Sequence, residues 1–258
     1  MSEHSRGGER SPQPEDAFER FAAVYDQLGF DRFTPTAIRK CTEFLAESQL
    51  AVTSLLDLAC GTGHFAIDMA GKGINVTGVD GSAQMIKQAH KNAGRMKNKP
   101  QWIQGEFMSF DAGSRFDLVT CWFDSLNHLL TDAQLTRCFR RVYRHLEKGG
   151  AFLFDVNTAI GLKERWSTAN YRSDMDSTLM LKTFAEPAGE FAWLELEAFV
   201  KRGKHYERIK IPFYQRGLSA DTLQTCLTAA RFRDIDIVAF DGPDPVEDAS
   251  RLLVSAWR

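Results

Sequence analysis

An acidic residue and two glycines lie at a spacing that could hold a ligand. Asp57 opens the run Asp-Leu-Ala-Cys-Gly-Thr-Gly-His, which contains Gly61 and Gly63. Glycine tolerates a positive φ and has no Cβ, so the main chain of such a turn can approach a ligand closely. The carboxylate suits an ammonium group better than a phosphate. The run therefore predicts a turn that holds a nucleoside-bearing cofactor.

Two further carboxylates follow at the predicted ends of the next two strands. Asp80 is placed to accept hydrogen bonds from both hydroxyls of a ribose. Glu106 stands beside Phe107, so that its carboxylate could bind an adenine amino group while the aromatic ring flanks the base. Together with Asp57, these residues predict three acidic contacts to one nucleoside-bearing ligand.

A dinucleotide-binding dehydrogenase is the main alternative at this turn. Gly61, Gly63 and Ala66 also fit Gly-x-Gly-x-x-Ala, a pattern that on its own is weak. An ordinary glycine turn among solvated acids is a second alternative. Asp57 argues against a dinucleotide, because its carboxylate would repel a pyrophosphate and attract a cationic amino-acid end.

The elements that must position these residues alternate between short apolar strands and amphipathic helices, which is typical of a parallel α/β sheet. Predicted strands cover 54–58, 75–79, 101–104, 116–122 and 151–156, and predicted helices cover 65–70 and 83–96. A third helix starts with Thr131 and Gln134 in a capping-box arrangement and ends at Gly149-Gly150. Ligands of such sheets bind at the carboxyl ends of the strands.

The alternation stops after Asn157. Strands are predicted at 178–184, 191–200 and 205–214, joined by turns at 187–189 and 202–203, before a helix at 219–230 and strands at 235–240 and 252–257. We expect a disordered tail (1–16), an α/β domain (17–156 and 217–258) and an antiparallel β insert over the substrate (157–216). Apolar residues from Phe18 to Leu28 predict a short helix that acts as a lid.

Composition limits the function classes. The 258 residues are 43% apolar, enough for one substantial core, and the net charge of -2 gives no broad cationic field for nucleic acid. Basic residues at 87–99 and the four arginines at 137, 140, 141 and 144 are interpreted as solvated helix faces.

Five dispersed cysteines without a CxxC pair predict neither disulfides nor a metal site. No membrane-length apolar run or signal peptide is present, so we expect a cytoplasmic protein without a membrane partner. The sequence does not decide whether the protein forms a homo-oligomer.

Four segments together resemble the class I S-adenosylmethionine-dependent methyltransferases, specifically the bacterial small-molecule type with a β-rich insert. These segments are 57–63, 78–80, 104–106 and 147–150. The resemblance implies a Rossmann-like, doubly wound sheet of seven strands in the order 3-2-1-4-5-7-6 with the last strand antiparallel. It implies S-adenosyl-L-methionine as cofactor, with S-adenosyl-L-homocysteine as product. The predicted cofactor-binding residues are Tyr25, Asp57, Ala59, Gly61, Gly63, Asp80, Gly81, Met85, Glu106, Phe107 and Cys121.

The segment from Cys121 to His128 is placed by the resemblance beside the transferred methyl group. His128 and Asp124 are the predicted catalytic residues, with His128 as the base. The alternatives are a histidine that caps main-chain groups and a turn-forming aspartate. Residues predicted to contact the substrate are Asn127, Tyr171 and Tyr214. The segment has neither the Asn/Asp-Pro-Pro-aromatic nor the Pro-Cys motif of DNA methyltransferases.

The sequence thus predicts an enzyme that transfers a methyl group to an oxygen or nitrogen of a small-molecule metabolite. A methyltransferase acting on tRNA or protein is the first alternative. A cofactor-binding module without chemistry is the second, and a dinucleotide-dependent oxidoreductase is the third.

Overall fold

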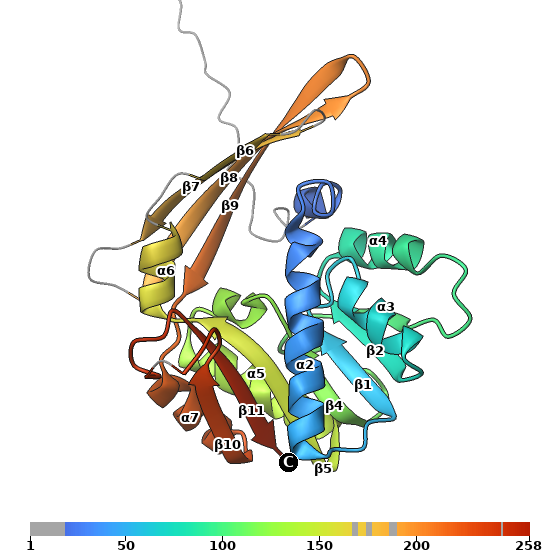
Figure 1. Cartoon of the computed structure of the whole chain (residues 1–258), viewed down its shortest axis with the longest axis vertical. Helices are drawn as coiled ribbons and strands as arrows, with labels where there is room; N and C mark the ends of the chain where they lie inside the picture. Colours follow the sequence, from blue (N-terminus) through green and yellow to red (C-terminus); the bar gives the residue numbers. More distant parts are fainter. Residues whose placement is uncertain (1–18, 167–169, 174–176, 186–189, 244) are drawn as a thin grey trace, which may run out of the picture.

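Two β-sheets make up the framework of the computed structural model, which describes residues 19–166, 170–173, 177–185, 190–243 and 245–258 (Figure 1). The larger sheet has seven strands in the order β10-β11-β5-β4-β1-β2-β3. β11 runs antiparallel to both of its neighbours, whereas β1 to β5 pair in parallel. If these seven strands are renumbered 1 to 7 in chain order and read from β3 to β10, their order is 3-2-1-4-5-7-6. This order confirms the predicted fold class.

The strands of the larger sheet start and end close to the predicted positions, with one exception. They are β1 (Ser54–Leu58), β2 (Asn75–Asp80), β3 (Gln101–Gln104), β4 (Phe116–Cys121), β5 (Leu146–Asn157), β10 (Arg233–Ala239) and β11 (Arg251–Trp257). β5 begins earlier than predicted, and the preceding helix does not reach Gly149-Gly150. Gly149 has a φ of 77° and donates its N–H to the Arg258 carbonyl at 3.1 Å, so these glycines bend a strand instead of ending a helix.

Helices cover both faces of the larger sheet (Figure 1). The helices on one face are α2 (Thr34–Ser48), α3 (His64–Gly71) and α4 (Ala83–Ala93), and those on the other are α5 (Asp132–His145) and α7 (Ala220–Ala229). Successive strand residues point to opposite faces. Leu55 accordingly packs in the core cluster under α2 and α3, whereas Leu56 packs in the cluster under α5 and α7. In the described residues, no helix is long and apolar enough to cross a membrane.

The smaller sheet is antiparallel and projects from the α/β domain (Figure 1). Its strands are β6 (Asn170–Ser173), β7 (Ser177–Ala185), β8 (Phe191–Arg202) and β9 (His205–Arg216). β8 and β9 form a hairpin that turns at Gly203, as predicted. α6 (Ala159–Trp166) packs on β7 and β8, and neither α6 nor β6 was predicted. The predicted turn at 187–189 lies outside the described residues.

The N-terminal segment, which we define as residues 19–33, joins the two sheets. It is helical at 19–22, continues as hydrogen-bonded turns to Gly29 and ends in η1 (Phe30–Phe33). The predicted helix to Leu28 is therefore wrong beyond Ala22, because Val24 and Gly29 donate to carbonyls three residues back and tighten the chain. Phe21 and Leu28 pack in one cluster with Leu196 and Ile211 of the smaller sheet, which we call the insert sheet. The predicted tail (1–16) lies outside the described residues.

Candidate active site

The turn after β1 is wound tightly and borders open space. Ala59, Gly61 and Gly63 have φ values of 58°, 54° and 85°. Left-handed geometry at a residue with a side chain, as at Ala59, is strain of the kind that collects at ligand sites. A Cβ built on Gly61 would meet no atom within 4 Å, whereas one on Gly63 would lie 2.5 Å from Trp102 Cη2. Gly61 thus leaves room for a ligand, and Gly63 allows close packing.

Asp80 and Glu106 converge beside this turn. Asp80 accepts hydrogen bonds from the main-chain N–H groups of Gly61 and Ser82, each at 2.9 Å. Burial raises the pKa of Asp80 to about 6, and the nearby charge of Glu106 adds to the increase. A Cβ on Gly81 would lie 2.9 Å from Glu106 Oε1, so this carboxylate lies against the chain that follows β2. The structure therefore brings Asp80, Gly81 and Glu106 together at one sheet edge.

Asp57 is more enclosed than the sequence indicates. Its side chain is 2% exposed, and its Oδ1 accepts a hydrogen bond from Thr120 Oγ1 at 2.9 Å. Burial raises the pKa of Asp57 to about 7. A cationic group nearby would favour the ionised carboxylate. The site that Asp57 borders is therefore electrostatically suited to a ligand with an ammonium group.

Of three other predicted cofactor-binding residues, Cys121 and Met85 are buried and Phe107 is partly buried. The Cys121 side chain is 0% exposed in the core under α5 and α7, so a contact with the cofactor would come from its main chain, and its predicted role stays a prediction. Phe107 packs against the same core. Met85 is buried against Phe21 of the N-terminal segment.

Asp26 ties the N-terminal segment to the glycine turn through contacts that the sequence did not reveal. Its carboxylate accepts hydrogen bonds from Thr62 Oγ1 at 2.6 Å and Asn92 Nδ2 at 2.9 Å, and it lies 3.2 Å from His64 Nε2. Burial alone would raise the pKa of Asp26, but these hydrogen bonds outweigh it and lower the pKa. The hydrogen bond to Asp26 raises the pKa of His64. We call these four residues the Asp26 latch.

Glu19 makes a second attachment of the N-terminal segment. Its carboxylate accepts the N–H groups of Ala83 at 2.7 Å and Gln84 at 3.2 Å, at the start of α4. A carboxylate there satisfies main-chain donors that lack a partner within the helix. Together with the Asp26 latch, this contact fixes both ends of the stretch that contains Tyr25. Burial and the charge of nearby Asp124 raise the pKa of the Tyr25 phenol, which stays protonated.

His128 ends η2 (Ser125–His128), which follows β4 and contacts β9. Its Nδ1 lies 2.9 Å from the main-chain carbonyl oxygen of Tyr214. A carbonyl only accepts, so Nδ1 carries the proton and the neutral ring has its lone pair on Nε2. Burial lowers the pKa of His128, although Asp124 opposes the shift, so the ring is neutral near pH 7. Its centroid lies 6.2 Å from the Phe213 ring.

The Asp124 carboxylate makes buried contacts that the sequence did not predict. Its carboxylate forms a buried ion pair with Arg251 and accepts a hydrogen bond from Gln215 Nε2 at 2.5 Å. Asp155, at the end of β5, pairs with Arg251 Nε at 2.9 Å and accepts the main-chain N–H of Phe123 at 2.7 Å. Phe123 and Asp124 both have positive φ values, 58° and 49°. Asp124 therefore anchors a strained loop and is not placed as a free acid or base.

Arg251, which no sequence pattern singled out, also holds aromatic rings together. Its guanidinium carbon lies 4.6 Å from the ring centroid of Phe33, 5.5 Å from Phe240 and 5.9 Å from Phe123. Phe33 and Phe123 are stacked at 4.9 Å. Cation–π attraction and the two ion pairs thus fix the end of the N-terminal segment onto the loop after β4.

The predicted substrate contacts are only partly placed near His128. Asn127 is 0% exposed, and its amide donates to the carbonyls of Asn157 at 2.8 Å and Arg216 at 2.7 Å, so it clamps the main chain and we leave it out of the acceptor site. The Tyr214 side chain is 53% exposed, whereas its neighbour Phe213 is buried beside His128, because adjacent strand residues face opposite ways. The Tyr171 side chain lies outside the described part of the structure.

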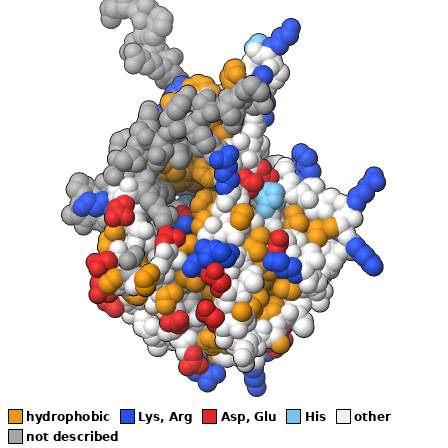
Figure 2. All heavy atoms as spheres, viewed as in Figure 1, with side chains coloured by type: hydrophobic (Ala, Val, Ile, Leu, Met, Phe, Trp, Pro, Cys, Tyr) orange, Lys and Arg blue, Asp and Glu red, His pale blue; other side chains and the backbone are white. Residues whose placement is uncertain are grey.

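The surface is hollowed between the insert sheet and the α/β domain. Figure 2 shows hydrophobic side chains in this hollow, below the segments drawn in grey. Phe21 of the N-terminal segment packs against the insert sheet, since its ring centroid lies 5.2 Å from Phe213, and it lies 5.0 Å from Tyr25 of the same segment. Among the described residues, no group of three His, Cys, Asp or Glu side chains could hold a metal ion.

Comparison with known proteins agrees with this geometry. A family model described as a methyltransferase domain matches residues 55–150. The candidate methyltransferase YqeM of Bacillus subtilis (strain 168) is 29% identical over 247 residues, which cover 93% of this chain and 97% of YqeM. The dTDP-3-amino-3,6-dideoxy-alpha-D-glucopyranose N,N-dimethyltransferase of Streptomyces fradiae is 34% identical over 103 residues, 40% of this chain and 38% of that enzyme.

A solved structure shares the fold over nearly the whole chain. The S-adenosylmethionine-dependent methyltransferase from Clostridium acetobutylicum ATCC 824 superposes with a TM-score of 0.78 at 24% identity, and covers 93% of this chain and 98% of its own. The open space at Gly61 and the carboxylates of Asp80 and Glu106 fit the nucleoside-bearing cofactor of these enzymes. Residues 55–150 thus match a methyltransferase domain, and the chain has the fold of an S-adenosylmethionine-dependent methyltransferase.

Proposed function

We propose that the protein transfers the methyl group of S-adenosylmethionine to a nitrogen or oxygen of a small-molecule metabolite that enters the hollow beside His128. The cofactor supplies an activated methyl group on a sulfonium sulfur. The chain's residues then have to hold the acceptor in line with that methyl group and exclude water. The N-terminal segment and the insert sheet, joined through Phe21 and Phe213, suit this enclosing role.

The observation that carries the proposal is the state of His128. Its Nδ1–H donates to the Tyr214 carbonyl, and its lowered pKa keeps Nε2 unprotonated near neutral pH. A fixed, neutral imidazole in an aromatic setting can accept a proton from a hydroxyl or an ammonium. Asp124 and Arg251 position the loop that carries it.

Nitrogen is the acceptor atom we favour. The Streptomyces fradiae relative is named for N,N-dimethylation of an amino sugar, and its likeness covers 103 residues, 40% of this chain. An amine is protonated at neutral pH and must lose a proton before it can attack, which gives the neutral His128 a task. The proposed cofactor-binding residues are those that line the glycine turn: Tyr25, Asp57, Ala59, Gly61, Gly63, Asp80, Gly81 and Glu106.

A screen for turnover tests this function. The wild-type protein and His128→Gln would be incubated with S-adenosylmethionine and panels of amino sugars, other small amines and alcohols, with S-adenosylhomocysteine release as the readout. We expect product with members of the amine panel, and a kcat lowered about 10²-fold in His128→Gln. The cofactor Kd of that variant should stay within about twofold of wild type.

Three results would point elsewhere. Turnover with tRNA or protein but not with small molecules would support the macromolecular alternative. Cofactor binding without turnover on any acceptor would support a binding module. An unchanged kcat in His128→Gln would remove the base from the proposal while leaving the small-molecule acceptor in place.

A further inference from the structure

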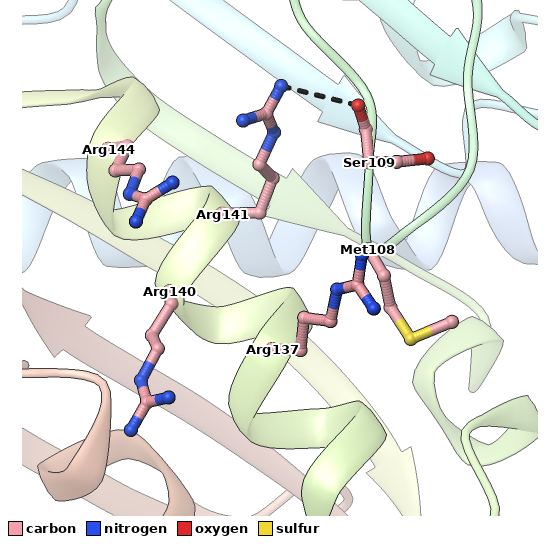
Figure 3. A pocket seen from close by; sticks show the side chains of 6 residues that line it. All are labelled: Met108, Ser109, Arg137, Arg140, Arg141 and Arg144. Atoms are coloured by element: carbon pink, nitrogen blue, oxygen red, sulfur yellow. Dashed lines mark hydrogen bonds between the residues drawn. The ribbon is translucent and has the colours of Figure 1, made fainter.

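The outer face of α5 carries four arginines that the methyl-transfer site does not use. Arg137, Arg140, Arg141 and Arg144 recur three and four residues apart, so they form one stripe along the helix. We call this set the arginine stripe. It borders a surface cavity of about 400 Å³, whose other lining residues are Met108 and Ser109 (Figure 3). Among the described residues, none of those that line this cavity is acidic.

Like-charge repulsion within the stripe is only partly compensated: Arg141 and Arg144 line an adjoining surface cavity together with Asp111 and Glu147, whereas Arg137 and Arg140 do not. Every one of its members has a like-charged neighbour three or four residues away, an arrangement that destabilises a helix. After Asp132, α5 contains no Asp or Glu. In the described part of the chain, Arg141 alone lies near a carboxylate, at 3.8 Å from Asp111, and no ion pair involves Arg137, Arg140 or Arg144. The helix dipole favours positive charge only in the last turn, at Arg144.

The stripe is also prearranged for an anion. Arg141 donates to the carbonyl oxygens of Phe110 and, at 3.2 Å, Ser109, which fixes its side chain toward the loop after β3. In Figure 3, Arg137 extends toward the same loop beside Met108, and Arg144 lies on the other side of Arg141. A guanidinium group presents a planar fork of donors that matches a phosphate in two places at once.

From these observations we infer that the arginine stripe is a second binding site, for a small ligand that carries two or three phosphate groups. The cavity is within the usual size range of small-molecule sites. Two or three linked phosphates offer more acceptor oxygens along the helix and can engage more of the guanidinium groups at once than a single phosphate can. The chain's net charge of -2 disfavours a long polyanion, which would meet repulsion beyond the stripe.

Calorimetric titration of the full chain with tripolyphosphate, pyrophosphate and orthophosphate at physiological salt tests this inference. We expect one saturable site for tripolyphosphate, with a Kd at least tenfold lower than that for orthophosphate. The double variant Arg137→Gln/Arg144→Gln should weaken tripolyphosphate binding at least tenfold. The control Lys87→Gln/Lys91→Gln removes the same charge from α4 and should change the Kd less than twofold.

Thermal unfolding provides a second readout that a structural role would not produce. Without phosphate, Arg137→Gln/Arg144→Gln should have a Tm equal to or about 1–3 °C above that of wild type, because like-charge repulsion is removed. Its Tm should no longer rise with tripolyphosphate, while S-adenosylmethionine binding stays unchanged.

Several outcomes would overturn the inference. Equal weakening in both double variants would indicate general electrostatics. Orthophosphate binding as tight as tripolyphosphate would indicate an adventitious ion only. A single-stranded RNA of twenty nucleotides that binds more than tenfold tighter than tripolyphosphate would indicate a nucleic-acid surface instead. A large fall in Tm of Arg137→Gln/Arg144→Gln would indicate that these side chains support the fold.

Discussion

Asp26 Oδ2 and His64 Nε2 lie 3.2 Å apart and join the N-terminal segment to the first turn of α3. The pKa of Asp26 is lowered and that of His64 is raised, so both groups are charged between these two pKa values. The stabilisation from His64 is complete below its ordinary pKa of about 6.5 and disappears as pH rises through the raised pKa. The stabilisation from Asp26 disappears only as pH falls through its lowered pKa. The Asp26 latch is therefore strongest in mildly acidic solution.

His64→Gln should consequently lower the free energy of unfolding more at pH 6.0 than at pH 8.5. We expect a difference of about 0.5–1 kcal/mol between the two pH values, a small figure because both side chains are partly exposed and screened by solvent. Urea unfolding at each pH would measure it. His90→Gln on the exposed side of α4 is the control and should show no such pH dependence. An equal loss at both pH values would contradict the ion pair.

Asp80→Asn should weaken cofactor binding far more than it weakens the fold. The amide keeps one acceptor oxygen, but its NH₂ group would face the N–H of Gly61 or Ser82, both of which donate to Asp80. We expect the Kd for S-adenosylmethionine to rise about 10- to 100-fold, or about 1.4–2.8 kcal/mol. Calorimetric titration measures this, with Asp68→Asn on α3 as a control of equal charge change. A Kd within twofold of wild type would exclude Asp80 from the cofactor site.

Arg251→Gln should strongly destabilise the protein at neutral pH. Arg251 lies between the carboxylates of Asp124 and Asp155, and removing it leaves both buried without a positive partner. Breaking a buried pair in this way costs about 3–5 kcal/mol. Burial already raises the pKa of Asp155 to about 6, and without Arg251 it would be higher, so the loss should shrink at pH 5 as the carboxyl protonates.

Chemical denaturation of Arg251→Gln at pH 7 and pH 5 would measure this change. Arg231→Gln, an exposed arginine after α7, is the control and should lose less than about 0.5 kcal/mol at either pH. If the Arg251→Gln loss were the same at both pH values, or larger at pH 5, the two carboxylates would not be the cause.

Local signals explain how much of this protein could be predicted from its sequence. Strand periodicity and the glycine turn depend on residues within a few positions of one another, and they were enough to predict the larger sheet and the convergence of Asp80 with Glu106. The capping box of Thr131 and Gln134 was predicted for the same reason and is present. The resemblance supplied what local signals lack, the strand order.

Contacts between distant segments could not be predicted in this way. Asp124 and Arg251 are 127 positions apart, and no local pattern distinguishes Arg251 from an exposed arginine at the start of a strand. Asp124 was therefore predicted as a catalytic residue, with a turn-forming role as the alternative, and its buried ion pair was not foreseen. The orientation of β9 likewise depends on pairing register, which placed Phe213 and not Tyr214 beside His128.

Alanine substitutions at the two glycines of the turn should separate cofactor binding from stability. Both residues have a positive φ, so each substitution should cost about 1–2 kcal/mol of backbone strain. A Cβ at Gly61 would meet nothing else, but it would occupy the space left for the cofactor. At Gly63 a Cβ would overlap with Trp102 at 2.5 Å and with Ala89 at 2.9 Å, which adds about 1–3 kcal/mol. Gly61→Ala should therefore raise the Kd for S-adenosylmethionine at least tenfold with a modest fall in Tm, and Gly63→Ala should show the larger fall in Tm. Titration and thermal unfolding of the two variants side by side would decide this. If Gly61→Ala bound the cofactor as wild type does, the open space at Gly61 would not be part of the cofactor site.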